Sequence, residues 1–259
     1  MADRWYFFVY YLLVNLYVKG VSMAQAEKIV NLKEVQARKR GKSEAQVINL
    51  PQFVYDITQY ALFPINYLIG VACEFQPNQS KWDNVKSSAI QGSGKSLEEI
   101  QQDILDEKDI VFLEEDLVKL YDSLPTASAE EDLIGRTWRG RILRTGGSVL
   151  DFAQNFLVRP LSELGLSWGK RYKSQHIGDP LIVSWQDKIF VPIPAWGNVG
   201  MTDIRWRGEV TATMNYDFQP WKDYFRILHQ SDEKTVLLGV WTHRDIAGGW
   251  FTLTLLDVE

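Results

Sequence analysis

Polar and apolar residues alternate one for one between residues 209 and 216. The polar positions are Glu209, Thr211, Thr213 and Asn215, and the apolar positions are Val210, Ala212, Met214 and Tyr216. A period of two is typical of a half-buried strand. Residues 217–220 (DFQP) interrupt the alternation with turn chemistry, because proline fixes its φ angle and donates no hydrogen bond. A second strand is expected from Trp221, so this stretch predicts a hairpin.

Similar strand patterns follow one another through the C-terminal half. We expect strands near residues 137–144, 167–174, 181–185, 188–193, 206–216, 221–229, 235–244 and 249–257. Turn signals such as Gly146-Gly147 and Ser231-Asp232 separate them. Short strands in series, with few helix-length segments between them, favour an up-and-down barrel over a βαβ fold. Residues 150–157 predict one helix that closes an end of this barrel.

Helical patterns dominate the first 125 residues. Residues 23–40 place Ile29, Leu32 and Val35 near one face of an amphipathic helix. A capping box at residues 96–99 (SLEE) starts a helix that runs to about residue 106, and residues 114–123 predict another. We therefore expect an α+β protein. A mainly helical extension (residues 1–125) precedes a small antiparallel β-barrel domain (residues 126–259).

Residues 5–18 form an apolar run in which only Asn15 is clearly polar. The run is shorter than the roughly 20 residues of a membrane-spanning helix. We interpret it as a buried helix or a hydrophobic arm, which together with residues 52–75 packs onto the barrel. A cytoplasmic protein, with membrane contact through this segment, is expected. A signal peptide over residues 1–24 is the alternative, because Ser22-Met23-Ala24 resembles a cleavage site.

Charge and cysteine content narrow the classes of function. The net charge of -5 argues against a nucleic-acid-binding protein, which presents a basic face. Cys73 is the single cysteine, and the 3 histidines lack the spacing of metal ligands, so no metal site is predicted. Residues 89–96 (AIQGSGKS) fit a relaxed phosphate-loop pattern, but the preceding residues are too polar for the strand that this motif requires. We interpret the segment as an ordinary loop and expect no cofactor.

From about Glu114 to Glu259 the chain resembles a family named for a Gly-x-Trp-x-Gly motif, with its companion C-terminal domain of unknown function. The matching segments are residues 133–140 (LIGRTWRG), 168–172 (WGKRY), 208–217 (GEVTATMNYD), 219–220 (QP), 223–225 (DYF) and 237–240 (LLGV). The resemblance implies a lipocalin-like barrel and says almost nothing about activity. In such barrels a Trp early in the first strand stacks on an Arg late in the barrel. Trp138 and Arg244 are the expected pair.

One strand face carries the candidate chemistry. Asp223, Phe225, Ile227 and His229 alternate along residues 221–229, so an inward-facing Phe225 brings Asp223 and His229 inward as well. Burial in an apolar barrel raises the pKa of an unpaired carboxyl group, which then acts as an acid or base near neutral pH. We expect catalysis by Asp223, with Asp217 and His229 as further candidates. The alternative is that Asp223 lies at the barrel rim and caps the turn with Asp217.

The aromatic content is the second functional signal, because a ring-lined cavity with a few polar groups is typical of sites for apolar small molecules. The expected ligand-binding residues are Tyr172, Trp185, Tyr216, Trp221, Phe225 and Trp241. The leading hypothesis is a cofactor-independent isomerase or cyclase that moves a proton in a terpenoid, lipid or polyketide-like substrate. A non-catalytic carrier of such a ligand and a membrane-peripheral interaction protein are the alternatives.

Overall fold

The computed structural model describes residues 46–47, 92–146, 162, 166–185, 189–193, 196–217, 219–244 and 246–256. These residues belong to one compact unit, Ala45–Glu259. The expectations for residues 5–18, 23–40, 52–75 and 150–157 lie outside them. The division of the chain at residue 125 stays a prediction.

Two predicted helices are confirmed in type and position. α4 (Leu97–Leu105) begins at the capping box, in which Ser96 accepts a hydrogen bond from the Glu99 amide and Glu99 accepts one from the Ser96 amide. α5 (Glu114–Ser123) follows. The Lys95 ammonium, 2.9 Å from a carboxylate oxygen of Asp103, forms an exposed ion pair. The Ser96 hydroxyl thus occupies the α4 N-terminus, where a phosphate-loop motif would present amides to phosphate.

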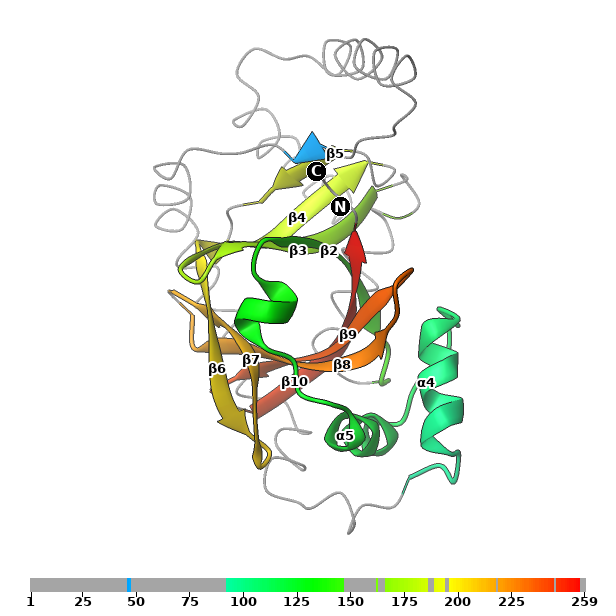
Figure 1. Ribbon diagram of the computed structural model, residues 1–259. Coiled ribbons are helices and arrows are strands. Elements are labelled where there is room, and N and C mark those ends of the chain that lie inside the picture. Colours follow the sequence, from blue (N-terminus) through cyan, green and yellow to red (C-terminus); the bar gives the residue numbers. More distant parts are fainter. Residues whose placement is uncertain are drawn as a thin grey trace, which may run out of the picture. The chain divides into compact units, whose positions relative to one another are not determined.

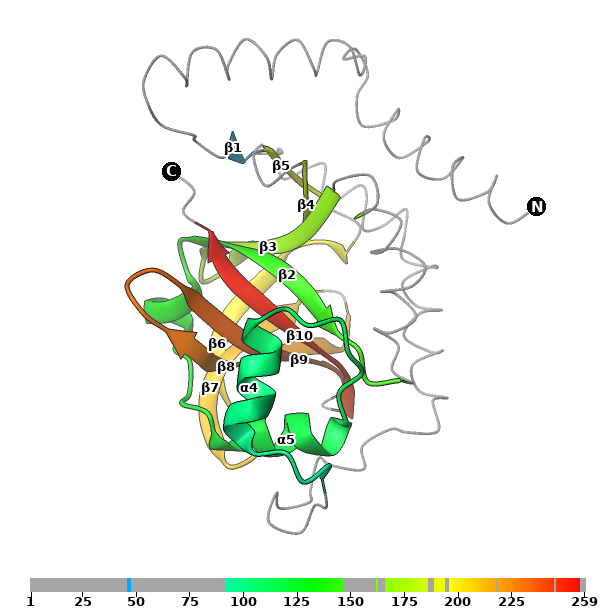
Figure 2. The ribbon, with the colours of Figure 1, turned by 90° about the vertical axis from the view of Figure 1, so that its right-hand side faces the viewer.

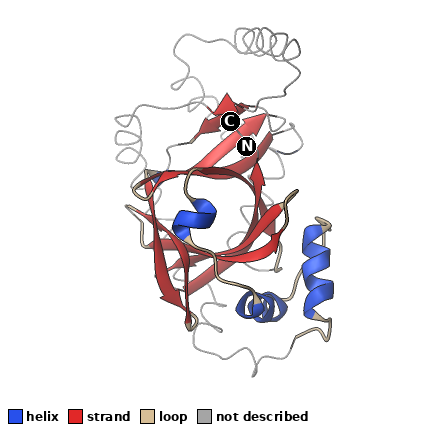
Figure 3. Cartoon of the chain, viewed as in Figure 1, coloured by secondary structure: helices blue, strands red, loops and turns tan. Residues whose placement is uncertain are grey.

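The strands form one sheet in the described part of the chain. They are β1 (Gln46–Val47), β2 (Arg136–Leu143), β3 (Leu166–Ser174), β4 (Ile177–Trp185), β5 (Ile189–Pro192), β6 (Val199–Trp206), β7 (Glu209–Tyr216), β8 (Trp221–Gln230), β9 (Thr235–His243) and β10 (Ile246–Leu256). Their order is β1-β5-β4-β3-β2-β10-β9-β8-β7-β6. β1 pairs parallel with β5, and each of the other pairings is antiparallel. The predicted antiparallel sheet is therefore confirmed (Figure 3).

The sheet curls strongly but is not closed by a continuous ladder among the described residues (Figure 1). Its β6 edge meets the turn between β3 and β4, where the Met201 amide donates to the Gln175 carbonyl at 2.7 Å. Asn198 reinforces this contact, because its side chain donates to the His176 carbonyl and accepts from the Gly178 amide. The closed barrel expected from the sequence is replaced by a curled sheet whose β6 edge meets the β3–β4 turn through one backbone hydrogen bond and the Asn198 side chain.

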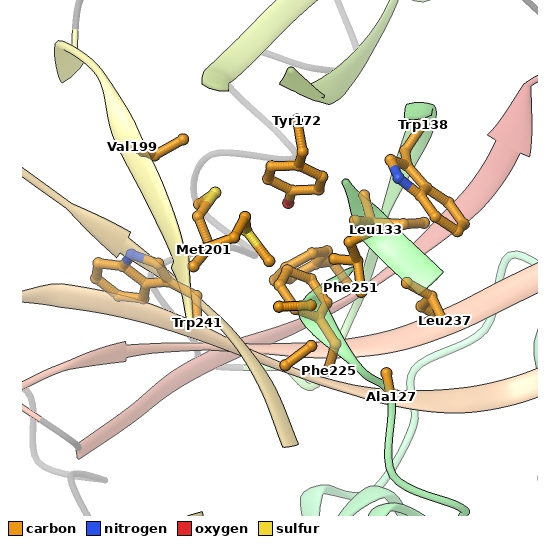
Figure 4. Close-up of a cluster of buried hydrophobic side chains, with 14 of the residues drawn as sticks. Ala127, Leu133, Trp138, Tyr172, Val199, Met201, Phe225, Leu237, Trp241 and Phe251 are labelled. Atoms are coloured by element: carbon orange, nitrogen blue, oxygen red, sulfur yellow. The ribbon is translucent and has the colours of Figure 1, made fainter. Parts of the chain in front are cut away.

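The two faces of the sheet bury separate hydrophobic clusters. The interior cluster includes Trp138, Tyr172, Phe225, Trp241 and Phe251 (Figure 4). The outer cluster joins Tyr224, Leu238 and Trp250 of the sheet to α4 and α5, which lie against its outer face (Figure 2). Both faces of β8 are therefore buried, and its polar residues need partners inside the protein.

A short π-helix, η2 (Ala129–Leu133), lies across one opening of the curled sheet (Figure 1). Its Leu133 side chain is fully buried in the interior cluster. The Ala129 amide donates to Asp203 of β6, and the Ala127 carbonyl accepts from the Ala212 amide of β7. This segment closes one end of the interior in the described part of the chain.

The sequence patterns overlooked β1 and most of β6. Glycine and polar residues interrupt the alternation over most of β6 (Val199–Trp206), and the strand expected there began only at residue 206. β6 is held by β7 along its whole length, from the pair Val199 and Tyr216 to the pair Trp206 and Glu209.

Among the described residues, no helix has both the length and the apolar content needed to cross a membrane.

Candidate functional site

Two strands on opposite walls of the curled sheet supply the polar residues of the interior. On β8, Trp221, Asp223 and Phe225 alternate inward, and Asp223 has no exposed surface. The inward orientation predicted for Asp223 is confirmed, and the alternative position at an exposed rim is wrong. On β3, Lys170 and Tyr172 are buried as well. Three strands separate β3 from β8 in the sheet order, so their side chains meet across the interior.

An ion pair crosses the interior between these two strands. Lys170 Nζ lies 3.0 Å from Asp223 Oδ2, with only 5% and 1% of the two side chains exposed. Lys170 Nζ also donates to the Pro180 carbonyl at 3.1 Å and to the Tyr216 hydroxyl oxygen at 3.2 Å. These three acceptors match the three hydrogens of an ammonium group. Lys170 is therefore a fully hydrogen-bonded cation that holds one oxygen of Asp223.

Burial and charge shift the titration of the acidic groups in this cluster. Burial raises the pKa of Asp223 above its ordinary value of 3.8, while the Lys170 ammonium and the Tyr216 hydroxyl oppose that rise. Burial also raises the pKa of Tyr216 and of Tyr172 well above the ordinary phenol value, and the nearby Asp223 carboxylate raises both further. The two phenols consequently remain protonated hydrogen-bond donors at neutral pH.

Four polar atoms on the interior side are buried without a hydrogen-bond partner in the described part of the chain. They are Asp223 Oδ1, Tyr172 Oη, Trp138 Nε1 and Trp168 Nε1. The Tyr172 hydroxyl points toward the middle of the interior cluster (Figure 4). Leaving a buried polar group unpaired costs roughly 1–3 kcal/mol. Among the described residues, the interior therefore contains one unpaired carboxylate acceptor and three unpaired donors.

Aromatic rings surround this polar cluster. The Trp221 ring packs edge-on against Tyr216, Trp196 and Trp241, at centroid distances of 5.5, 6.1 and 5.4 Å. Its indole nitrogen donates to His243 Nδ1 at 3.1 Å, which fixes the ring. Phe225 packs edge-on against Tyr172 at 6.2 Å. Five of the expected ligand-binding residues thus line the interior, while the side chain of Trp185 lies outside the described residues.

Two predicted catalytic residues are not brought to the cluster. Asp217 is exposed in the turn before β8, where it accepts a hydrogen bond from Asn198 at 2.9 Å. His229 lies beyond an irregularity in the β8–β9 pairing between Ile227 and His229, which ends the regular alternation. The inward direction inferred for His229 from that alternation therefore has no basis in the observed register.

The expected stack of Trp138 on Arg244 is wrong. Trp138 pairs with Leu255 near one end of β10, whereas Arg244 follows His243, which pairs with Ile246 at the other end. Nine residues of strand separate these positions, about 30 Å. The arginine side chain is exposed. The lipocalin comparison therefore does not extend to this pair.

Lys170 is the site residue that the sequence reasoning missed. Its signal was the alternation of Trp168, Lys170 and Tyr172, which places one lysine between two aromatic residues on a single strand face. Gly169 is needed beside it, because a Cβ atom there would lie 2.0 Å from the Trp138 carbonyl oxygen of the adjacent strand. The two strands approach closely at this point.

No group of three metal-ligating side chains occurs in the part of the chain described.

Comparison with known proteins matches a family model and a solved structure over parts of the chain. Residues 197–255 match the model of a family described as a domain of unknown function (DUF4334). This match supports the C-terminal part of the resemblance and does not reach the Gly-x-Trp-x-Gly segment. No curated protein matches the chain. A crystal structure of a protein from Thermomonospora curvata is similar, with 24% identity, a TM-score of 0.46, and coverage of 61% of this chain and 96% of that one.

Proposed function

We propose that the protein is a cofactor-independent isomerase or cyclase that moves a proton within an apolar small molecule. The observation that carries the proposal is the fully buried Asp223, with one oxygen held by Lys170 and the other unpaired among the described residues. A terpenoid, lipid or polyketide-like compound fits the ring-rich surroundings.

In the proposed reaction Asp223 Oδ1 takes a proton from a carbon atom of the bound compound. The same carboxyl group then returns a proton at a different carbon, so a double bond moves or a ring closes. One proton leaves and one returns, and the elemental composition of the compound is unchanged. The proton on the carboxyl group exchanges with solvent before one is returned, so the new C–H bond carries a proton from water.

Each neighbour of Asp223 has a separate part in this mechanism. Lys170 favours the ionised form of Asp223 against the effect of burial, so that it starts the reaction as a base. Tyr216 lies 3.5 Å from Asp223 Oδ2 and shares that oxygen with Lys170. Both groups orient the carboxylate and leave Oδ1 directed away from the ion pair. Lys170 and Tyr216 are positioning residues, and Asp223 is the catalytic residue.

A compound trapped in the protein tests the proposal even while the substrate is unidentified. The Asp223→Asn variant and the native protein are produced in the native host, and their apolar extracts are compared by chromatography and mass spectrometry. We expect two compounds of equal mass and different retention, because the variant retains substrate and the native protein retains product. The native protein should convert the first compound into the second.

The matched control is Asp232→Asn, the same chemical change at an exposed position in the turn after β8. It should retain the same compound as the native protein. Recovery of one identical compound from all three proteins, with no conversion, would show a carrier and contradict catalysis. The carrier is the alternative function, since the aromatic interior would serve it equally well.

A further inference from the structure

We infer that the site recognises an oxygen function, a hydroxyl or a carbonyl group, on its apolar ligand, through the Tyr172 hydroxyl and Asp223 Oδ1 together. This inference rests on the proposed function and narrows its substrate class. The compound is thus not a plain hydrocarbon, and its oxygen sets the position at which the proton is moved.

The first argument is the placement of the two side chains. Lys170 meets Asp223 across the interior, and Tyr172, two residues further along β3, meets Phe225, two residues further along β8. Tyr172 on β3 and Asp223 on β8 are therefore offset by one inward-facing position on strands that face each other across the interior. The Asp223 carboxylate is close enough to raise the pKa of Tyr172. The inference therefore assigns one oxygen function of the ligand to both side chains.

The second argument is the chemistry of the unpaired atoms. An ammonium group on the ligand could donate to Asp223 Oδ1, but it would lie beside the Lys170 ammonium and leave the three donors unpaired. A carboxylate would be repelled by Asp223, and a hydrocarbon would leave every buried polar atom unpaired. A hydroxyl group both donates to Asp223 Oδ1 and accepts from Tyr172. A carbonyl accepts from Tyr172 and acidifies the neighbouring C–H that Asp223 attacks.

Trp138 and Trp168 extend this donor set. Their indole nitrogens are buried on the same side of the sheet, and each is unpaired in the described part of the chain. Trp168 packs against Phe251 at 6.1 Å, and Lys170 Nζ lies 5.5 Å from that same ring. With donors outnumbering the single acceptor, the site favours ligands that accept hydrogen bonds.

Three naphthalene probes test the inference by fluorescence titration of the full chain. They are 2-naphthol, naphthalene and 2-naphthoate, which share one apolar skeleton and differ in the polar group. We expect 2-naphthol to bind roughly tenfold more tightly than either of the others, as one to two added hydrogen bonds provide. The preference over naphthalene should shrink in Tyr172→Phe and persist in Asp232→Asn.

Equal affinity for naphthol and naphthalene would overturn the inference, as would no binding of any probe or an unchanged preference in Tyr172→Phe. A melting curve checks that this variant folds. Asp223→Asn is the second variant, and we expect it to weaken naphthol binding as well. The two proposals can fail separately. If the protein binds naphthol selectively but Asp223→Asn converts the trapped compound at the native rate, the inference stands and the proposed function is rejected.

Discussion

The two faces of strand β8 bury charge in different ways. On the interior face, Asp223 is paired with Lys170 and retains one unpaired oxygen. On the outer face, Arg226 lies 5.2 Å from the centre of the Tyr121 ring and donates to the Leu124 carbonyl at the C-terminal end of α5. No carboxylate of the described residues pairs with this arginine. Its cation instead stabilises a helix end and an aromatic face.

The difference separates a structural charge from a candidate functional one. The outer face also contains unpaired polar atoms, namely Tyr121 Oη, Arg226 Nε and Trp250 Nε1, but these lie among packed aromatic rings. Among the described residues, a buried carboxylate oxygen without a hydrogen-bond partner occurs only on the interior face. That oxygen can accept a proton, whereas the outer groups can only contribute to packing and hydrogen bonding.

The largest expected effect comes from replacing the buried cation on each face by methionine. Lys170→Met leaves Asp223 without its partner, and removing one member of a buried pair costs roughly 3–5 kcal/mol of unfolding free energy. Arg226→Met removes one hydrogen bond and a ring contact, about 1 kcal/mol, because no buried anion is left behind. Urea unfolding at neutral pH measures both, and equal losses would remove the distinction between the faces.

The pH dependence of stability sharpens the same comparison. The pKa of Asp223 is raised in the folded protein, so folding favours the protonated form. The native protein should therefore lose stability relative to Asp223→Asn as pH rises from the ordinary value of 3.8 through the raised pKa. In Lys170→Met this loss should be larger and extend to higher pH. A difference that stays constant with pH would show that Asp223 titrates normally.

The tyrosines of the interior should respond in opposite directions. Tyr172→Phe removes a buried hydroxyl that has no partner among the described residues, and we expect a gain of about 1 kcal/mol in stability. Tyr216→Phe removes an acceptor of the Lys170 ammonium, and we expect a loss of about 1 kcal/mol. Thermal unfolding of both variants measures the signs. Destabilisation of similar size in both would mean that Tyr172 has a structural partner.

The smallest effect is expected at Asp217, the other carboxylate of the same hairpin. It is exposed, and among the described residues its side chain bonds to Asn198, so Asp217→Asn should leave the melting temperature and the conversion of the trapped compound close to native values. A rate as low as that of Asp223→Asn would make Asp217 a catalytic candidate again.

Local signals predicted the parts of the fold that local chemistry determines. The capping box at Ser96 located α4, and the alternation after Glu209 located β7 and β8. The junction of β6 with the β3–β4 turn depends on contacts between distant segments, such as Met201 with Gln175, and no local pattern encodes it. The π-helix at Ala129–Leu133 was missed for the same reason, since it is held by β6 and β7.

In the candidate site too, the sequence predicted what depends on local pattern and missed what depends on contacts between distant strands. The burial of Asp223 and Phe225 followed from a period of two along one strand. Its ion pair with Lys170 did not, because the partner lies on another strand and only the curl of the sheet brings them together. His229 was misplaced because an irregular pairing interrupts the period before it.

Deuterium uptake from heavy water tests the central claim, proton transfer by Asp223, most directly. The compound retained by Asp223→Asn is returned to each protein in heavy water, and its mass and deuterated position are followed with time. The account predicts uptake at the carbon that receives the returned proton. The rate should fall roughly 10²–10⁴-fold in the folded Asp223→Asn variant, as expected for a positioned acid or base. Uptake at the native rate by that variant, or no uptake by the native protein, would contradict it.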